Sequence, residues 1–533
     1  MFVFTSSNRG LLVYTLNEKQ EAILHSKIDE ECKFFESAKD GSMLAYVNRK
    51  GVHLIDVPSL KPIRIIAAER VYGIQFSPKL TYLSLATTYL CKPGEQPKPN
   101  LFIIKCSTGE IVHSYVQQKQ AEWEPHWFSD ESYLVRSFKN AVMLYDPADF
   151  SKTAKQINIE RISAISLSPL VSKKYFASYV PPSGKGQPAF CRIFNLHQAD
   201  AVASKSFFKC DSVQFKWNAK GSDLLIMATS EVDKSNTSYY GEQALHYANV
   251  KGDSCMVQLK KKGPIHCHEW VNENFCVVYG FMPSHTTIFN LKCDPVWDLG
   301  PGPRNLVYLN PQGNILLTAG FGNLQGTVET WDLEQQKRIC QMKIPDTTHL
   351  EFATDGIHFL TATLAPRLRV NNGFKIWHYS GALKTEILPV KDDPDSFEEM
   401  RSASLQKGPM GPKPTIIFKK VEGIAQSLPM PSKQAYRPPG MRALEESKPA
   451  QKKQNKKKSK PKFEEAQPPT PKVDPSITKA DDDEKKARAI KKKLSQIYVL
   501  KARLDAGEEL EPEQVVKISK EKELSDELKQ LEL

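Results

Sequence analysis

Residues 349–379 read HLEFATDGIHFLTATLAPRLRVNNGFKIWHY, and the fold of the chain can be worked out from this stretch. Leu350 and Phe352 alternate with polar neighbours, as in a half-buried strand. The dipeptide Asp355-Gly356 is a turn signal between two strand-like runs, and the stretch ends on Trp377-His378-Tyr379. Such an antiparallel sheet has two faces to cover and an open edge, so we expect neighbouring sheets of the same kind.

The strand–turn–strand half of this unit recurs along the chain. The copies are residues 34–47, 74–87, 126–137, 165–180, 213–228, 267–280, 307–320 and 350–363. Successive copies begin roughly 39 to 54 residues apart, and a four-stranded propeller blade needs about 40–50 residues. Radial repetition also leaves only short sheet edges. We therefore predict an all-β chain with a nine-bladed β-propeller over residues 1–421. A run of separate β-sandwiches would lack this fixed period.

Closure of the predicted ring depends on the two ends of the repeat region. Residues 399–421 form a weaker ninth unit, with strands expected at 400–405 and 415–418. Because glycines and prolines replace a clear second strand there, an eight-bladed ring is the alternative. We expect the N-terminal strands 2–5 and 11–16 to pair with the last blade and lock the ring.

The residues after Val421 have a different composition. Residues 422–480 are dense in Pro, Lys, Ser and Gln, which predicts a disordered linker. Within the linker, residues 448–462 hold eight lysines and no acid. Residues 481–533 carry apolar residues at helical spacing around a glycine and a proline. We predict a short C-terminal helical hairpin there.

Bulk properties indicate a cytoplasmic protein with an anionic partner. The formal charge is +12, of which +5 lies after Val421 and +7 before it. The ten cysteines are scattered without a CxxC pair, which favours a reducing compartment and argues against structural zinc. No run approaches the roughly 18 apolar residues of a membrane span. A basic balance favours an anionic partner, although many proteins without one share it.

The sequence contains no recognisable catalytic motif. It has no GxxxxGK[ST] loop, no GxSxG elbow and no HExxH pair. The cluster His266-Cys267-His268 lies on a predicted strand, where alternate residues face opposite sides, and no second ligand pair is nearby. We therefore predict a protein that is not an enzyme, with no catalytic residue, metal, cofactor or small-molecule substrate.

The basic segments are the candidates for binding. A lysine run neutralises phosphates and gives salt-sensitive, sequence-blind affinity for nucleic acid. The alternatives for residues 448–462 are a nuclear-localisation signal or a solvated linker. Arg367 and Arg369 lie between two predicted strands, where arginine can fork onto phosphate. Their alternative is an ordinary surface turn.

Several long strings resemble one family, that of eukaryotic translation initiation factor 2A. They keep the family's order along the chain: SYYGEQ at 238–243, VYGFMP at 278–283, IFNLKCDP at 288–295, GPRN at 302–305, AGFGN at 319–323, APRLRVNNGFKIWHY at 365–379 and AYRPP at 435–439. The sequence departs from the family at 397–402, where the family has a Trp-rich strand and this chain reads FEEMRS.

The resemblance implies a nine-bladed WD40-type propeller followed by a flexible basic tail. It also implies a factor that associates with the 40S ribosomal subunit. This factor would deliver or stabilise initiator methionyl-tRNA at the start codon without GTP, and mRNA and other initiation factors would be further partners. The missing P-loop agrees with GTP independence. The alternative is a WD-repeat protein–protein scaffold of initiation complexes that does not bind tRNA directly.

The expected ribosome- and RNA-binding residues lie on loops of the propeller and in the basic tail. They are Tyr239, Tyr240, Arg304, Arg367, Arg369, Asn371, Asn372 and Gly373 on the propeller, and Lys452, Lys453, Lys456, Lys457, Lys458, Lys491, Lys492 and Lys493 in the tail.

Overall fold

A computed structural model describes most of the first 418 residues of the chain. The described residues are 1–418 except 8, 18–20, 29, 92–93, 139, 171, 185, 198–199, 209, 231–240 and 390–398, together with Ile497. The chain divides into two units, Met1–Met430 and Pro431–Leu533. The predicted linker and helical hairpin lie outside the described residues, apart from Ile497.

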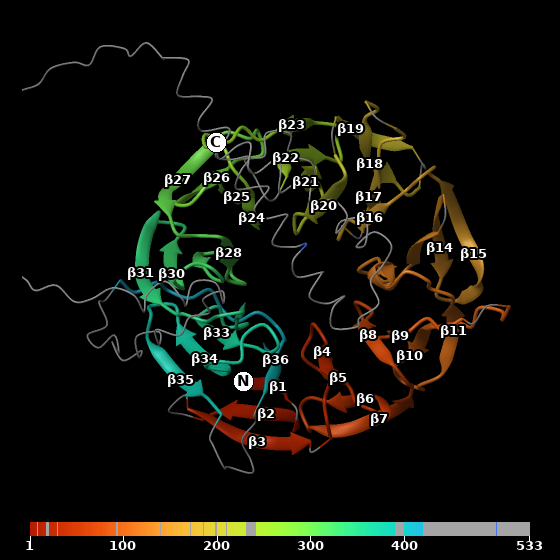
Figure 1. Cartoon of the computed structure of the whole chain (residues 1–533), viewed down its shortest axis with the longest axis horizontal. Helices are drawn as coiled ribbons and strands as arrows, with labels where there is room; N and C mark the ends of the chain where they lie inside the picture. Colours follow the sequence, from red (N-terminus) through yellow and green to blue (C-terminus); the bar gives the residue numbers. More distant parts are fainter. Residues whose placement is uncertain are drawn as a thin grey trace, which may run out of the picture. The chain divides into compact units, whose positions relative to one another are not determined.

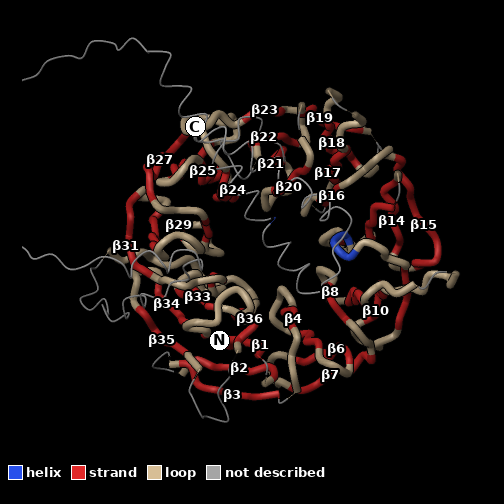
Figure 2. Tube along the Cα trace, in the orientation of Figure 1, coloured by secondary structure: helices blue, strands red, loops and turns tan. Residues whose placement is uncertain are grey.

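The first unit is a ring of nine antiparallel four-stranded sheets (Figure 1). Each sheet is one blade, and its strands follow one another from the centre of the ring outward. In the described part of the chain, strands predominate and the short η1 (Gln120–Glu122) is a 3-10 helix (Figure 2). The prediction of nine blades is confirmed.

We number the blades in chain order, and list the strands of each from the inside out. Blade 1 is β4 (Phe34–Ser37), β5 (Met43–Val47), β6 (Gly51–Asp56) and β7 (Lys61–Ala67); blade 2 is β8 (Val71–Phe76), β9 (Tyr82–Thr87), β10 (Leu101–Lys105) and β11 (Ile111–Tyr115); blade 3 is β12 (His126–Trp127), β13 (Leu134–Phe138), β14 (Ala141–Asp146) and β15 (Asp149–Asn158); blade 4 is β16 (Ala164–Leu167), β17 (Tyr175–Val180), β18 (Ala189–Asn195) and β19 (Ala201–Phe207).

The next four blades follow the same order. Blade 5 is β20 (Ser212–Trp217), β21 (Asp223–Ser230), β22 (Glu242–Asn249) and β23 (Ser254–Met256); blade 6 is β24 (Ile265–Val271), β25 (Asn274–Tyr279), β26 (Ser284–Phe289) and β27 (Pro295–Gly302); blade 7 is β28 (Leu306–Leu309), β29 (Ile315–Gly320), β30 (Thr327–Asp332) and β31 (Lys337–Lys343); blade 8 is β32 (His349–Phe352), β33 (His358–Thr363), β34 (Gly373–His378) and β35 (Leu383–Ile387).

Blade 9 is assembled from both ends of the propeller. Its inner strand is β36 (Met400–Leu405), and its other strands are β1 (Phe2–Ser7), β2 (Gly10–Leu16) and β3 (Ala22–Ile28). The expected pairing of the N-terminal strands with residues 400–405 is confirmed, and β3 is an additional strand. The expected strand at 415–418 is wrong, because these residues form no sheet ladder.

Apolar side chains fill the interfaces between blades. Most buried apolar residues of the described ring fall into nine clusters, and each cluster joins two neighbouring blades. One of them packs Leu12 and Met400 of blade 9 against Phe374 of blade 8. Because blade 9 also packs on blade 1 through Phe4 and Leu44, the series of interfaces closes on itself.

The antiparallel order gives the ring two different faces. The turns between first and second strands, and between third and fourth strands, lie on one face, which we call the turn face. The loops between second and third strands, and the connections from blade to blade, lie on the other, which we call the loop face. The Pro/Gly-rich insertions of the sequence, at 91–100 and 181–188, both belong to the loop face.

Residues 406–418 run over the turn face. The Gly411 N–H donates to the Thr354 carbonyl at 2.9 Å, and the Asn314 side-chain amide donates to the Pro414 carbonyl at 2.9 Å. We call residues 406–418 the strap. Gly41, with φ of 76°, lets the strap pass close to the β4–β5 turn, because a Cβ on Gly41 would lie 1.9 Å from the Lys407 carbonyl oxygen. These contacts with turns explain why the segment follows no sheet edge.

The cysteines differ in one respect from the expectation for a reducing compartment. Cys255 of β23 and Cys293 of the β26–β27 turn form a disulfide between blades 5 and 6. The other eight cysteines are thiols. No helix among the described residues is long and apolar enough to cross a membrane.

Packing at the closing blade can be tested by truncating one side chain. Leu12 is fully buried between blades 8 and 9, so Leu12→Ala should lower the free energy of unfolding by about 2–5 kcal/mol. Ile23 lies on the outer strand of the same blade and is 50% exposed, so Ile23→Ala should cost less than about 1 kcal/mol. Urea denaturation measures both; equal losses would contradict the closure of the ring by blade 9.

Candidate nucleic-acid interface

The described propeller residues that were predicted to bind RNA all belong to the loop face. Arg304 lies in the connection from β27 to β28, and Arg367, Arg369 and 371–373 lie in the loop between β33 and β34. Tyr239 and Tyr240 belong to the segment between β21 and β22 but lie outside the described residues, as do the eight predicted tail lysines. The topology therefore brings predictions from separate blades to one side of the ring.

Arg367 and Arg369 are exposed on this face. The Arg367 guanidinium lies over Gly322 of the neighbouring blade 7 loop, since a Cβ on Gly322 would sit 3.4 Å from its Nη2. Arg369 is 74% exposed, and its Nη2 lies 3.5 Å from Glu399 Oε1. An ion pair this exposed contributes little to stability, so the Arg369 guanidinium remains available to an incoming phosphate.

Asn371 has a conformational role in the same loop. It has a φ of 55°, a left-handed conformation that asparagine tolerates better than most residues, and its side-chain amide donates to Asp346 Oδ2 at 3.1 Å. Asn371 is nevertheless exposed, so it stays a candidate contact beside the two arginines.

Asn372 and Gly373 are buried, which corrects the prediction that they bind RNA. The Asn372 amide donates to the carbonyls of Thr363 and Met400 at 2.9 and 3.0 Å, and its oxygen accepts the Met400 N–H at 2.5 Å. A Cβ on Gly373 would lie 2.3 Å from the Ile387 carbonyl oxygen. Both residues hold the chain in place: Asn372 fixes β36, and Gly373 permits close approach to β35.

Arg304 is also buried, so the prediction that it contacts RNA needs the same correction. Its side chain is 5% exposed and its Nε donates to Glu329 Oε2 at 2.6 Å. Its Nη1 donates to the Gly300 carbonyl at 2.9 Å, and the guanidinium lies over the Trp331 ring at 5.3 Å. The Arg304 guanidinium therefore makes its hydrogen bonds within the interface between blades 6 and 7.

The sequence prediction missed a lysine triplet on the loop face. Lys260, Lys261 and Lys262 precede β24, in the connection from blade 5 to blade 6. The Lys261 amine donates to the carbonyls of Phe281 and Pro283, both at 2.8 Å, which ties this connection to the β25–β26 loop. Lys260 and Lys262 are exposed beside it. The sequence signal that could have revealed this basic loop is the run of three consecutive lysines before a glycine.

Exposed apolar side chains accompany these cations. Phe281 and Met282 at the tip of the β25–β26 loop are 46% and 41% exposed, and Val370 beside Arg369 is 68% exposed. Aromatic rings interleaved with cations can stack on unpaired bases. The combination also suits a protein partner. The loop face of blades 6 to 8 can therefore bind phosphate, bases or an apolar protein surface.

The described residues hold no cluster of three or more metal-ligating side chains. Within the sequence His266-Cys267-His268, the His266 ring is hydrogen-bonded to the Gly280 carbonyl at 2.9 Å, and the side chain of His268 is buried. Burial lowers the pKa of His268 to about 4.

Comparisons with known proteins agree with the sequence strings. The family model described as eukaryotic translation initiation factor eIF2A matches residues 205–389. Eukaryotic translation initiation factor 2A of Drosophila melanogaster is 40% identical over 77% of this chain and 66% of its own length. The Caenorhabditis elegans protein of the same name is 33% identical over 94% of this chain and 93% of its own length. This chain belongs to the eukaryotic translation initiation factor 2A family.

A solved structure supports the same assignment. The crystal structure titled as that of the eukaryotic initiation factor matches this chain with a TM-score of 0.69 and 30% sequence identity. The match covers 77% of this chain and 99% of the chain in that structure. The segment matched by the family model runs from β19 to the end of β35, so it includes the β25–β26 and β33–β34 loops. The loop face of blades 6 to 8 thus falls within the family's matched region.

The structural role of Arg304 gives a testable expectation. Arg304→Ala leaves Glu329 buried with one remaining cationic partner, the half-exposed Arg338, and a 3.4 Å hydrogen bond from the Thr318 hydroxyl, so the free energy of unfolding should fall by about 3–5 kcal/mol. Arg338→Ala removes the more exposed of the two arginines that pair with Glu329, and should lower the free energy of unfolding by about 1 kcal/mol or less. Urea denaturation of both variants measures this difference. An Arg304→Ala protein of unchanged stability would show that the arginine is free for other contacts.

Proposed function

We propose that this translation initiation factor associates with the 40S ribosomal subunit in the cytoplasm and promotes GTP-independent delivery or stabilisation of initiator methionyl-tRNA at the start codon. Membership of the family carries the proposal. The cations on the loop face of blades 6 to 8 support it, because rRNA and tRNA both present phosphates. The sequence holds no P-loop for GTP.

In this proposal the ring and the tail have separate tasks. Arg367, Arg369 and Lys262 of the rigid loop face make the positioned contacts. The lysines of residues 448–462 add sequence-blind attraction to phosphate. A tether raises the effective concentration of the second contact once the first has formed. mRNA and other initiation factors are the further partners that fit this arrangement.

The second candidate is a protein–protein scaffold of initiation complexes that does not bind tRNA directly. The exposed Phe281, Met282 and Val370 favour it, because apolar side chains at loop tips suit a protein surface. Digestion of accessible RNA separates the two functions. Association with small subunits that survives ribonuclease supports the scaffold, and association that is lost supports direct contact with RNA.

Charge reversal on the loop face should weaken binding to small subunits. Arg367→Glu with Arg369→Glu removes two phosphate contacts, so the slope of log affinity against log salt should become shallower by roughly 1–2. A chain ending at Val421 lacks the lysines of residues 448–462, so its slope of log affinity against log salt should be shallower still. Co-sedimentation with purified 40S subunits at several salt concentrations measures both variants.

Lys251→Glu with Lys292→Glu is the matched control. Both lysines are exposed on the turn face and the change in charge is the same. This control should bind 40S subunits as the unaltered protein does. If it loses as much affinity as the loop-face variant, binding reflects net charge and the loop face has no special role.

A further inference from the structure

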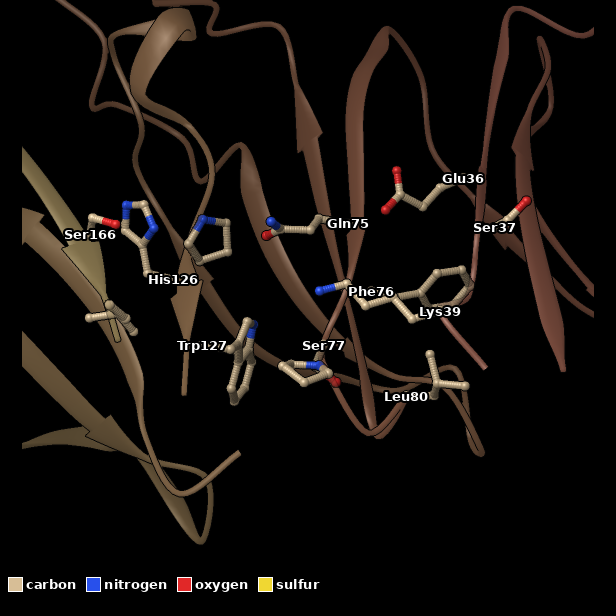
Figure 3. A pocket seen from close by; sticks show the side chains of 13 residues that line it. Glu36, Ser37, Lys39, Gln75, Phe76, Ser77, Leu80, His126, Trp127 and Ser166 are labelled. Carbon is tan, nitrogen blue, oxygen red and sulfur yellow. The ribbon is translucent and has the colours of Figure 1, made fainter. Parts of the chain in front are cut away.

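A polar cavity lies at the opposite end of the ring from the loop face. It has a volume of about 310 Å³ and is lined by the inner strands of blades 1 to 4, where these strands reach the turn face (Figure 3). Its walls include Glu36, Gln75, Phe76, His126 and Trp127. None of the described residues proposed above for RNA binding lines it.

Three side chains that line this cavity, those of Ser37, Gln75 and Trp127, have a buried polar atom without a partner among the described residues. Gln75 Oε1 is an unpaired acceptor, and Trp127 Nε1 is an unpaired donor among the described residues. The plane of the Trp127 ring is fixed by stacking on Tyr82 at 5.3 Å. Figure 3 shows the Gln75 amide between His126 and the Glu36 carboxylate. Because buried polar groups are normally hydrogen-bonded, these atoms indicate that a polar ligand completes the cavity.

The cavity also contains the carboxylate of Glu36, which lacks a cationic partner among the described residues. Glu36 makes no ion pair with a described residue, and burial, with a smaller contribution from Glu124, raises its pKa. Lys39 also lines the cavity and, like Lys407, favours the charged form of Glu36, but neither amine forms an ion pair with it: Lys39 is exposed, and the Lys407 amine is bonded to Glu351. Burial also lowers the pKa of His126, so this ring is uncharged at neutral pH.

We propose that this cavity binds an arginine side chain of a partner protein. A guanidinium carries five N–H donors and no acceptor, so it can bond the Glu36 carboxylate and Gln75 Oε1 together. The apolar stem of arginine can pack on Phe76 and Trp127. The Trp127 N–H is then placed to donate to a backbone carbonyl of the same peptide.

The charge of the cavity selects a protein over a nucleic acid. Phosphates would face the unpaired Glu36 carboxylate and the Gln75 acceptor, whereas a guanidinium matches both. A lysine ammonium would supply the charge, but it cannot span two acceptors with a planar fork. The partner's arginine therefore enters from the turn face, while RNA is expected on the loop face.

The probe for this proposal is the blocked tripeptide acetyl-Gly-Arg-Gly-amide. Saturation-transfer NMR and a titration against the full chain should detect binding. Glu36→Gln keeps the shape of the side chain, removes the charge and should weaken binding of the tripeptide roughly tenfold or more. Glu160→Gln, at an exposed position on the loop face, should leave the affinity unchanged. Thermal unfolding confirms that both variants remain folded.

Two further peptides and one further variant decide the interpretation. The same tripeptide with lysine or with citrulline in place of arginine should bind at least several-fold more weakly. Lysine lacks the planar, two-pronged guanidinium, and citrulline lacks the positive charge. Arg367→Glu with Arg369→Glu should bind the arginine tripeptide normally, so failure of the RNA proposal would not affect this one. Absence of saturation transfer, equal binding of the three peptides, or full affinity in Glu36→Gln would overturn the proposal.

Discussion

The structure depends on the pairing of the chain's first strand with the last strand of the propeller. β1 and β36 are neighbours in blade 9, with Val3 opposite Leu405 and Thr5 opposite Ala403. Without this ladder blade 9 would lose its inner strand, and two blades would expose apolar interfaces to water. Blade 8 holds β36 in place from its other side, through Asn372 and through Glu351, which accepts the Leu405 N–H at 3.1 Å.

Closure of the ring separates two kinds of surface. The loop face of blades 6 to 8 presents Arg367, Arg369 and the lysine triplet at 260–262 on loops that neighbouring blades hold rigid. The turn face carries the strap at 406–418 and the polar cavity beside Glu36. A single ring can thus offer cations to RNA on one side and a carboxylate to a protein partner on the other.

Periodicity made the fold predictable, whereas single side-chain partners were not. The spacing of turns and apolar pairs predicted nine blades, because every blade repeats the same burial pattern. Arg304 and Asn372 were misjudged because their partners, Glu329 and the backbone of Met400, are distant in the sequence. The strand expected at 415–418 had apolar residues, but this segment bonds to Tyr379 and forms no sheet. The cavity could not be predicted because four blades contribute to it.

Covalent trapping of the closing ladder tests the account most directly. Ser6 and Ser402 lie opposite each other, with their hydroxyl oxygens 2.5 Å apart. In the double variant Ser6→Cys with Ser402→Cys, mild oxidation of the monomeric protein should join the two introduced thiols, and mass spectrometry of unreduced peptides should identify that link. Thiols that stay free, or links that form only between molecules, would contradict a ring closed by its own two ends.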